Sequence, residues 1–213
     1  MSFLTGKKVV VMGVANKRSI AWGCAQALKA QGAEVIYTYQ NDRMKKPLER
    51  LLESDEFVVE CDVANDESIA SAFETIKEYA GEIHGVVHAV AYANKEDLSG
   101  DILNISRDGY ALAQDISSYS LIAVTKYAKP ILAENAGIVT LSYLGAERAV
   151  PNYNMMGIAK AALESSVRYL AAELSPQKIR VNAISAGAIK TLAVTGVKDY
   201  QKLIQLSEDR TPD

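Results

Sequence analysis

Cysteine and histidine are scarce in this 213-residue sequence, which contains two of each. Cys24 and Cys61 stand far apart, which argues against a disulfide framework, so both thiols are expected to be reduced and mostly buried. His84 and His88 flank an apolar run that holds no other type of metal ligand. We therefore expect no bound metal.

The sequence also lacks an excess of positive charge and any long apolar run. Its net charge is −3 and its pI is about 5.5, which argues against nucleic acid as a partner. The apolar runs break within about eight residues, whereas a membrane-spanning helix needs about 20. The start MSFLTGKK has no small-residue cleavage site of the kind that ends a secretory signal. These features predict a cytoplasmic protein without a membrane segment.

Apolar and helical segments alternate along the chain. The expected strands are mostly continuous apolar runs, typical of strands buried on both faces, at 8–15, 34–39, 57–63, 83–91, 137–144 and 179–186. Helices are expected near 19–31, 42–54, 66–80, 107–135, 153–175 and 198–208, with Gly32 and Gly137 at positions where helices should end.

This alternation predicts an α/β fold, namely a single domain over residues 1–213 with a Rossmann-like doubly wound parallel β-sheet and helices on both faces. After the last expected helix the chain ends in the polar EDRTPD, which suggests that a final strand of such a sheet is absent here. Ligands of these sheets bind beyond the carboxyl ends of the strands, so the site is expected there.

A tyrosine and a lysine are suitably spaced for chemistry at that edge. Tyr153 precedes Lys160 by seven residues in a helical segment, which places both on one face about 20° apart around the axis. An ammonium close to a phenol lowers the pKa of the phenol and makes it a better proton donor. On its own, the pair favours a plainer interpretation, a core tyrosine with a solvated lysine, and only the surrounding strand ends shift the balance toward chemistry.

Each expected strand end carries candidate cofactor contacts. Gly13 turns the chain after the first strand, before a helix that starts near Ser19 and Ile20, although the loop also fits an ordinary connection. Asp62 either accepts from an adenine amino group, with Val63 beside it, or caps the next helix. Further candidates are the small Ala89 and Ala91, Tyr143, and the loop 185–191.

Together these residues resemble the short-chain dehydrogenase/reductase superfamily and, within it, the enoyl-acyl carrier protein reductase branch of the bacterial FabI type. The wider superfamily usually carries Tyr-x3-Lys, which no tyrosine here satisfies, whereas this branch carries Tyr-x6-Lys with a second tyrosine ten residues upstream. Tyr143, Tyr153 and Lys160 match that pattern. The segments GVANKRSIAWG, LSYLGAERAVPNYNMMGIAKAALE and RVNAISAGAIKTL look like the branch, and the resemblance extends from residue 2 to about 212.

The resemblance implies the fold and a role for each candidate. Tyr153 would bond the thioester oxygen, Lys160 would hold the nicotinamide ribose, and Tyr143 would orient the acyl chain or assist proton delivery. The implied cofactor contacts are Gly13, Ser19 and Ile20 at the pyrophosphate and ribose, Asp62 and Val63 at the adenine, and Val90, Ala91 and Ile189 at the nicotinamide. Ala93 matches a backbone contact to substrate. The family reads GPI where this chain has Ala188 in the middle, which would loosen that loop.

The implied function is reduction of trans-2-enoyl-acyl carrier protein to the saturated acyl form by hydride from NADH, in bacterial type II fatty acid biosynthesis. A carbonyl reductase acting on β-ketoacyl or alcohol substrates is an alternative, which the missing Tyr-x3-Lys disfavours. A non-catalytic dinucleotide-binding regulator is another, which the intact Tyr153 and Lys160 disfavour.

The choice of cofactor depends on the end of the second expected strand. Gln40 is neutral where NAD enzymes often place a carboxylate, and it matches members of the branch that prefer NADH. Arg43, Lys45 and Lys46 lie nearby and could attract a 2′-phosphate, so NADPH stays the less favoured option.

The expected partners are an acyl carrier protein and further copies of the chain. Acyl carrier proteins are acidic, and Lys198 and Lys202 stand four apart on one face of the expected helix within a substrate loop near 188–208. The helices at 107–135 and 153–175 match those that pair between subunits in the family, which implies a homotetramer.

Overall fold

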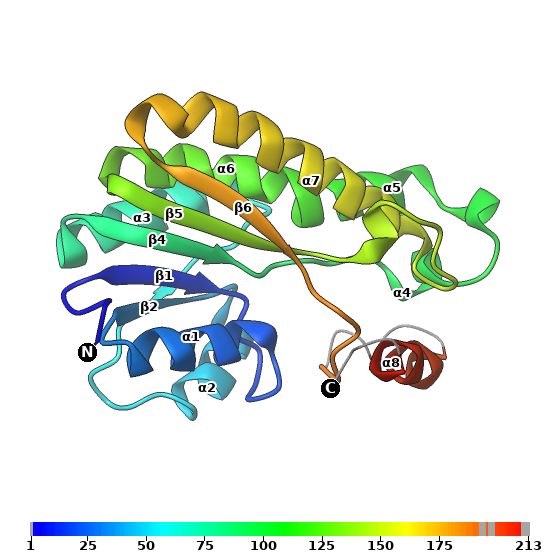
Figure 1. Ribbon diagram of the computed structural model, residues 1–213, viewed down its shortest axis with the longest axis horizontal. Coiled ribbons are helices and arrows are strands. Elements are labelled where there is room, and N and C mark those ends of the chain that lie inside the picture. The colour runs from blue at the N-terminus through cyan, green and yellow to red at the C-terminus, as the bar shows by residue number, and fades with distance from the viewer. Residues whose placement is uncertain (1, 192–194, 196–198, 210–213) are drawn as a thin grey trace.

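The computed structural model describes residues 2–191, 195 and 199–209. Six parallel strands form one sheet in the order β3-β2-β1-β4-β5-β6 (Figure 1). The strands are β1 Lys8–Met12, β2 Glu34–Tyr39, β3 Val58–Glu60, β4 Ile83–His88, β5 Leu132–Ser142 and β6 Arg180–Ser185. The order reverses between β1 and β4, which is the doubly wound arrangement that the sequence predicts and which opens a crevice at that point.

Helices cover both faces of the sheet, as expected. They are α1 Ile20–Ala30, α2 Asp42–Glu49, α3 Asp66–Ala80, α4 Lys95–Leu98, α5 Arg107–Gln114, α6 Ser120–Ala128, α7 Asn154–Leu174 and α8 Tyr200–Glu208. Helices α1 and α2 lie on one side of the strands, and α3, α6 and α7 lie on the other (Figure 1). Within the described residues, no helix is long and apolar enough to cross a membrane.

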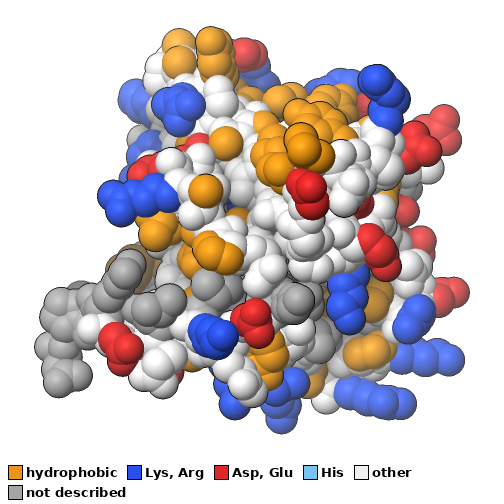
Figure 2. All heavy atoms as spheres, turned by 90° about the vertical axis from the view of Figure 1, so that its right-hand side faces the viewer, with side chains coloured by type: hydrophobic (Ala, Val, Ile, Leu, Met, Phe, Trp, Pro, Cys, Tyr) orange, Lys and Arg blue, Asp and Glu red, His pale blue; other side chains and the backbone are white. Residues whose placement is uncertain are grey.

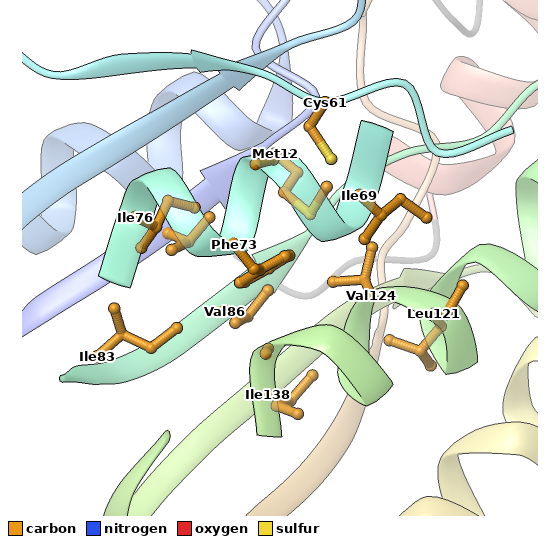
Figure 3. Packing of buried hydrophobic residues seen from close by; sticks show 14 of the residues in the cluster. Met12, Cys61, Ile69, Phe73, Ile76, Ile83, Val86, Leu121, Val124 and Ile138 are labelled. Atoms are coloured by element: carbon orange, nitrogen blue, oxygen red, sulfur yellow. The ribbon is translucent and has the colours of Figure 1, made fainter. Parts of the chain in front are cut away.

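The strands separate two hydrophobic cores, because successive side chains of a strand point to opposite faces. In β1, Val9 and Val11 pack with α1 on one face, whereas Val10 and Met12 join the larger core on the other. In that larger core the apolar faces of α3 and α6 meet over β4 and β5, with Phe73 at the centre of the view (Figure 3). Burial on both faces explains why the strands are continuous apolar runs.

Local signals fix where α3 begins and ends. The side-chain oxygen of Asn65 accepts hydrogen bonds from the backbone amides of Glu67 and Ser68, which satisfies two of the free N–H groups at the start of the helix. Acidic residues occupy its first turn, where they favour the positive end of the helix dipole. The helix stops at Gly81, whose φ of 71° suits glycine. Asn65 is therefore the capping residue, so the alternative that Asp62 caps this helix is wrong.

The helix expected over 107–135 is divided in the structure. Helix α5 passes into a π-helical turn, η2 Asp115–Tyr119, and then into α6. The short 3-10 turn η3 Lys129–Ile131 follows, where Pro130 cannot donate to a continuing helix, and β5 already begins at Leu132. The expectation that Gly137 ends a helix is wrong, because it pairs with Gly85 inside the sheet.

Candidate active site

The predicted site residues gather along one edge of the sheet. Strand pairing aligns Met12 with His88, His88 with Thr140, and Ser142 with Ser185, so the carboxyl ends of β1, β4, β5 and β6 lie side by side. The ends of β2 and β3 lie at the same edge, where Tyr39 pairs with Glu60. The residues placed beyond these six strand ends, or at the adjacent start of a helix, are Gly13, Ser19, Ile20, Gln40, Asp62, Val63, Val90, Ala91, Ala93, Tyr143, Tyr153 and Ile189. Figure 2 views this side of the molecule.

The first loop can approach its neighbour closely only because residue 13 is a glycine. Gly13 has a φ of 90°, and a Cβ built on it would lie 2.1 Å from the carbonyl oxygen of Ala89. Any larger residue would push apart the loops that follow β1 and β4. At the end of this loop the Ser19 hydroxyl donates to the Asn16 carbonyl at 2.5 Å and does not cap α1, so the amides of Ile20 and Ala21 at the start of this helix have no side-chain cap.

The ends of β2 and β3 are tied together at the outer part of the crevice. The side-chain amide of exposed Gln40 donates to Asp62 Oδ1 at 3.3 Å, and the same oxygen accepts from the Ala64 backbone at 3.2 Å. The next residue, Val63, is buried, and Arg43, Lys45 and Lys46 lie in or beside the first turns of α2. Lys and Arg side chains gather along the lower border of Figure 2, the side on which α1 and α2 lie.

The segment after β4 is anchored to the π-helical turn. The Ser117 hydroxyl donates to the carbonyl of Tyr92 and accepts from its amide, both at 2.8 Å. These two bonds fix the backbone between Ala91, which is exposed, and Ala93, which is half-buried. A π turn inside a helix often marks a functional site, and here it presents Ser117 to this loop.

Lys160 carries a buried charge at the centre of the site. It lies on α7 and is 7% exposed, and its ammonium donates to the carbonyl oxygen of Leu141, near the end of β5, at 2.7 Å. Burial lowers the pKa of Lys160 to about 8, while the nearby carboxylate of Glu164 acts to raise it. The amine is therefore protonated below about pH 8 and neutral above it.

Tyr153 immediately precedes α7, and its ring meets that of Tyr143 edge-to-face with 4.9 Å between centroids. Burial and then the neighbouring Tyr143 raise the pKa of Tyr153 well above its usual value. The expectation that the Lys160 ammonium lowers this pKa is wrong, because the loss of solvent outweighs any such effect and the ammonium bonds to a backbone carbonyl. Tyr153 is consequently a neutral hydroxyl that can donate a hydrogen bond.

Three residues that sequence reasoning did not identify support the site. His88 is fully buried and bridges Thr140 on β5, at 3.1 Å from Nδ1, and Ser120 on α6, at 2.9 Å from Nε2. The Ser120 hydroxyl also donates to the Ile116 carbonyl at 2.6 Å, and the Thr140 hydroxyl donates to the His88 carbonyl at 3.0 Å. The tautomer of His88 decides which of its two ring nitrogens donates. Burial and then the Lys160 charge lower the pKa of His88 to about 3, so the ring is neutral.

A polar histidine at the end of an otherwise apolar strand was the available signal for this network. Among the described residues, histidine, cysteine and carboxylate side chains form no group of three that could hold a metal ion. Burial raises the pKa of the Cys61 thiol to about 12.

The segment after β6 carries a predicted nicotinamide contact and the predicted docking residues. Ile189 follows β6 and is 50% exposed. Lys202 is exposed on α8, whereas Lys198 lies outside the described residues. Hydrophobic side chains gather in the upper half of Figure 2, and a groove lined by Ile102, Leu103, Ile105, Tyr110 and Ile158 is one exposed apolar feature near α5.

Comparison with known proteins bears on this site. Residues 13–213 match the enoyl-(acyl carrier protein) reductase family. The chain is 69% identical over 211 residues to the NADH-dependent enoyl-[acyl-carrier-protein] reductase FabI of Enterococcus faecalis, covering 99% of this chain and 84% of that protein. It is 48% identical over 213 residues to the Staphylococcus aureus FabI, which is named for NADPH, covering 98% and 83% of the two chains.

The crystal structure of the Bacillus cereus enoyl-acyl carrier protein reductase, in complex with NADP+ and indole naphthyridinone, superimposes with a TM-score of 0.95. The two sequences are 50% identical, and the match covers 100% of this chain and 84% of that one. With this fold, and with Tyr143, Tyr153 and Lys160 together at the strand ends, the chain belongs to the enoyl-(acyl carrier protein) reductase family.

Proposed function

We propose that this chain reduces trans-2-enoyl-acyl carrier protein to the saturated acyl form with NADH, in bacterial type II fatty acid biosynthesis. The single observation that carries the proposal is a buried Lys160 ammonium on α7 together with a neutral Tyr153 hydroxyl at the start of the same helix, at the edge where a doubly wound sheet binds dinucleotides. The names of the related enzymes support the same reaction. We infer that it takes place in the cytoplasm.

The residues present fit a nicotinamide dinucleotide. Gly13 leaves the first loop free of side-chain bulk, the open amides of α1 suit a pyrophosphate, and the Gln40 and Asp62 pair suits the adenosine end. Small Ala91 and half-buried Val90 suit a flat ring, and half-exposed Ile189 after β6 offers a further apolar contact. When bound, the cofactor supplies a hydride to the β-carbon of the enoyl thioester.

The protein side chains then stabilise the charge that develops on the substrate. Tyr153 donates its hydroxyl hydrogen bond to the thioester oxygen, where negative charge accumulates, and a preorganised donor of this kind is often worth about 3 kcal/mol. Lys160 holds the nicotinamide ribose and keeps positive potential below the phenol. Tyr143 packs on Tyr153 and orients the acyl chain or assists proton delivery, and the backbone at Ala93 contacts the substrate.

NADH is the cofactor that we expect this chain to prefer. The Enterococcus faecalis relative is named for NADH, and Gln40 already uses its amide to hold the Asp62 carboxylate. That carboxylate places negative charge beside the end of β2, which disfavours a 2′-phosphate. Arg43, Lys45 and Lys46 lie close enough in the sequence to leave some use of NADPH.

The proposed assembly is a homotetramer formed through α5, α6 and α7. These helices and the π turn expose large apolar side chains to solvent, namely Tyr110, Tyr119, Ile122 and Tyr169. Pairing between copies would bury them. Sedimentation equilibrium should give four times the 23.1 kDa chain mass, and a monomer at micromolar concentration would contradict the proposal.

Replacing Tyr153 by phenylalanine should lower turnover of an enoyl thioester by a factor on the order of 10², because one donor to the developing charge is lost. The NADH dissociation constant should stay nearly the same. Tyr79→Phe is the matched control, since Tyr79 is 43% exposed at the end of α3, at the edge of the sheet where β4 begins, and the variant should retain wild-type turnover. Full activity of Tyr153→Phe on crotonyl thioesters would refute the role of the hydroxyl.

NADH binding should weaken as the pH rises through about 8, the pKa of Lys160, because the deprotonated amine is a poorer donor to the ribose hydroxyls. Fluorescence titration of NADH at pH values on both sides of 8 measures this. Lys160→Arg, which stays charged, should flatten the dependence. An affinity that is constant across this pH range in the wild type would contradict the proposed contact.

Acyl carrier protein is proposed to dock on the segment 188–208, the proposed substrate loop, near Lys198 and Lys202. Exposed Lys202 on α8 offers positive charge to an acidic partner despite the net charge of −3. Lys198→Glu with Lys202→Glu should raise KM for carrier-protein thioesters several-fold and leave coenzyme A thioesters unaffected. Added salt should remove much of the wild-type advantage, since exposed charges are screened over about 10 Å at 0.1 M. Equal losses on both substrates would indicate damage to the loop instead.

A further inference from the structure

Glu164 lies one helical turn after Lys160 on α7, so both side chains face the end of β5. The hydroxyl of Ser142, the last residue of β5, donates to Glu164 Oε1 at 2.5 Å. Lys160 bonds to the carbonyl of the preceding residue, Leu141, at 2.7 Å. Lys160 and Glu164 thus form hydrogen bonds with two consecutive residues of β5.

Ser142 connects the end of β5 to α7 and to the segment that follows β6. It is 4% exposed, its carbonyl accepts from the amide of Ala186 at 3.1 Å where the chain leaves β6, and the next residue is Tyr143. A charge-assisted bond to a carboxylate is among the stronger hydrogen bonds available to a hydroxyl. Glu164 therefore restrains the strand end from which the ring of Tyr143 reaches Tyr153.

Glu164 also compensates the buried charge of Lys160. It is the one described residue whose charge raises the pKa of Lys160 against the effect of burial. The other titratable groups of the site are His88 on β4, on which the Lys160 charge acts, and the paired tyrosines Tyr143, after β5, and Tyr153, at the start of α7. The histidine is neutral because its pKa is about 3, and burial keeps both phenols protonated, so none of them supplies negative charge.

We propose that Glu164 is a positioning residue of the reduction site, which fixes the end of β5 through Ser142 and supplies the negative charge that keeps Lys160 protonated. Glu164 touches neither reacting atom, and it acts through Lys160 and through the strand end that carries Tyr143. The inference rests on the proposed function, because it assigns a purpose to the charged state of Lys160 within that reaction.

The effect of the Glu164 charge can be separated from the effect of its size and hydrogen bonding by substitution. Glu164→Gln keeps the size of the side chain and an oxygen that can accept from Ser142, but it removes the negative charge. The ionisation of Lys160 can be followed by NMR of 13C-labelled lysine in the full chain without cofactor, with the resonance assigned by its loss in Lys160→Arg. Glu164→Gln should increase the proton dissociation constant of Lys160 about tenfold, which is the usual scale for a close opposite charge. The upper limb of kcat/KM against pH should move to lower pH with it.

Glu173→Gln is the matched control, because Glu173 is exposed on the same helix and its loss should leave both readouts unchanged. Ser142→Ala keeps the carboxylate charge but removes its hydrogen-bond donor, so it should lower kcat several-fold without moving the titration of Lys160. If Glu164→Gln fails to fold, this second variant tests the positioning half, and an unchanged kcat overturns it.

An unmoved Lys160 titration in folded Glu164→Gln would overturn the charge half of the inference. Wild-type reduction of a crotonyl thioester is measured in the same series. A wild type that consumes no enoyl substrate would refute the proposed function, whereas an active wild type with an unmoved Lys160 titration refutes the role of Glu164 alone.

Discussion

The hydrogen bond between the Lys160 ammonium and the Leu141 carbonyl is the contact on which the geometry of the site depends. An unpaired charge that is 7% exposed would strongly destabilise the fold, so the protein must supply the ammonium with a fixed acceptor. That acceptor is backbone of β5, a strand paired on both sides, and is therefore more rigid than a side chain. The lysine is thereby held at the strand ends rather than snorkelling to solvent, and α7 is locked in rotation against β5.

The remaining parts of the site are rigid for related reasons. Gly13 lets the loops after β1 and β4 touch, and the Ser117 hydroxyl fixes the backbone of Tyr92 from the π turn. His88 then ties β4 to β5 and α6 through two hydroxyl groups. Each of these contacts joins elements far apart in the sequence. A cofactor would thus meet a crevice that is already formed, which limits the ordering needed for binding.

Burial sets the protonation states with which Tyr153 and Lys160 enter the proposed reaction. Removal from water keeps Tyr153 protonated, so it serves as a hydrogen-bond donor, and it brings the pKa of Lys160 down to about 8. Burial therefore stabilises the protonated phenol of Tyr153, which can donate a hydrogen bond, and destabilises the protonated ammonium of Lys160. A neighbouring carboxylate is what the amine then requires, and α7 provides it one turn later in Glu164.

The sequence alone determined the doubly wound parallel sheet, the family, and the sheet edge at which the candidate residues gather, because apolar runs, turn residues and the Tyr-x6-Lys spacing are local patterns. The sequence predicted the helix boundaries only partly. The helix expected over 107–135 ends earlier, near Pro130, and Gly137 lies inside the sheet rather than at a helix end. The tertiary structure decided the charge states of Tyr153 and Lys160 and the partners of His88 and Glu164. These depend on how far water is excluded and on which distant strand end faces each side chain, and no spacing within the chain encodes either quantity.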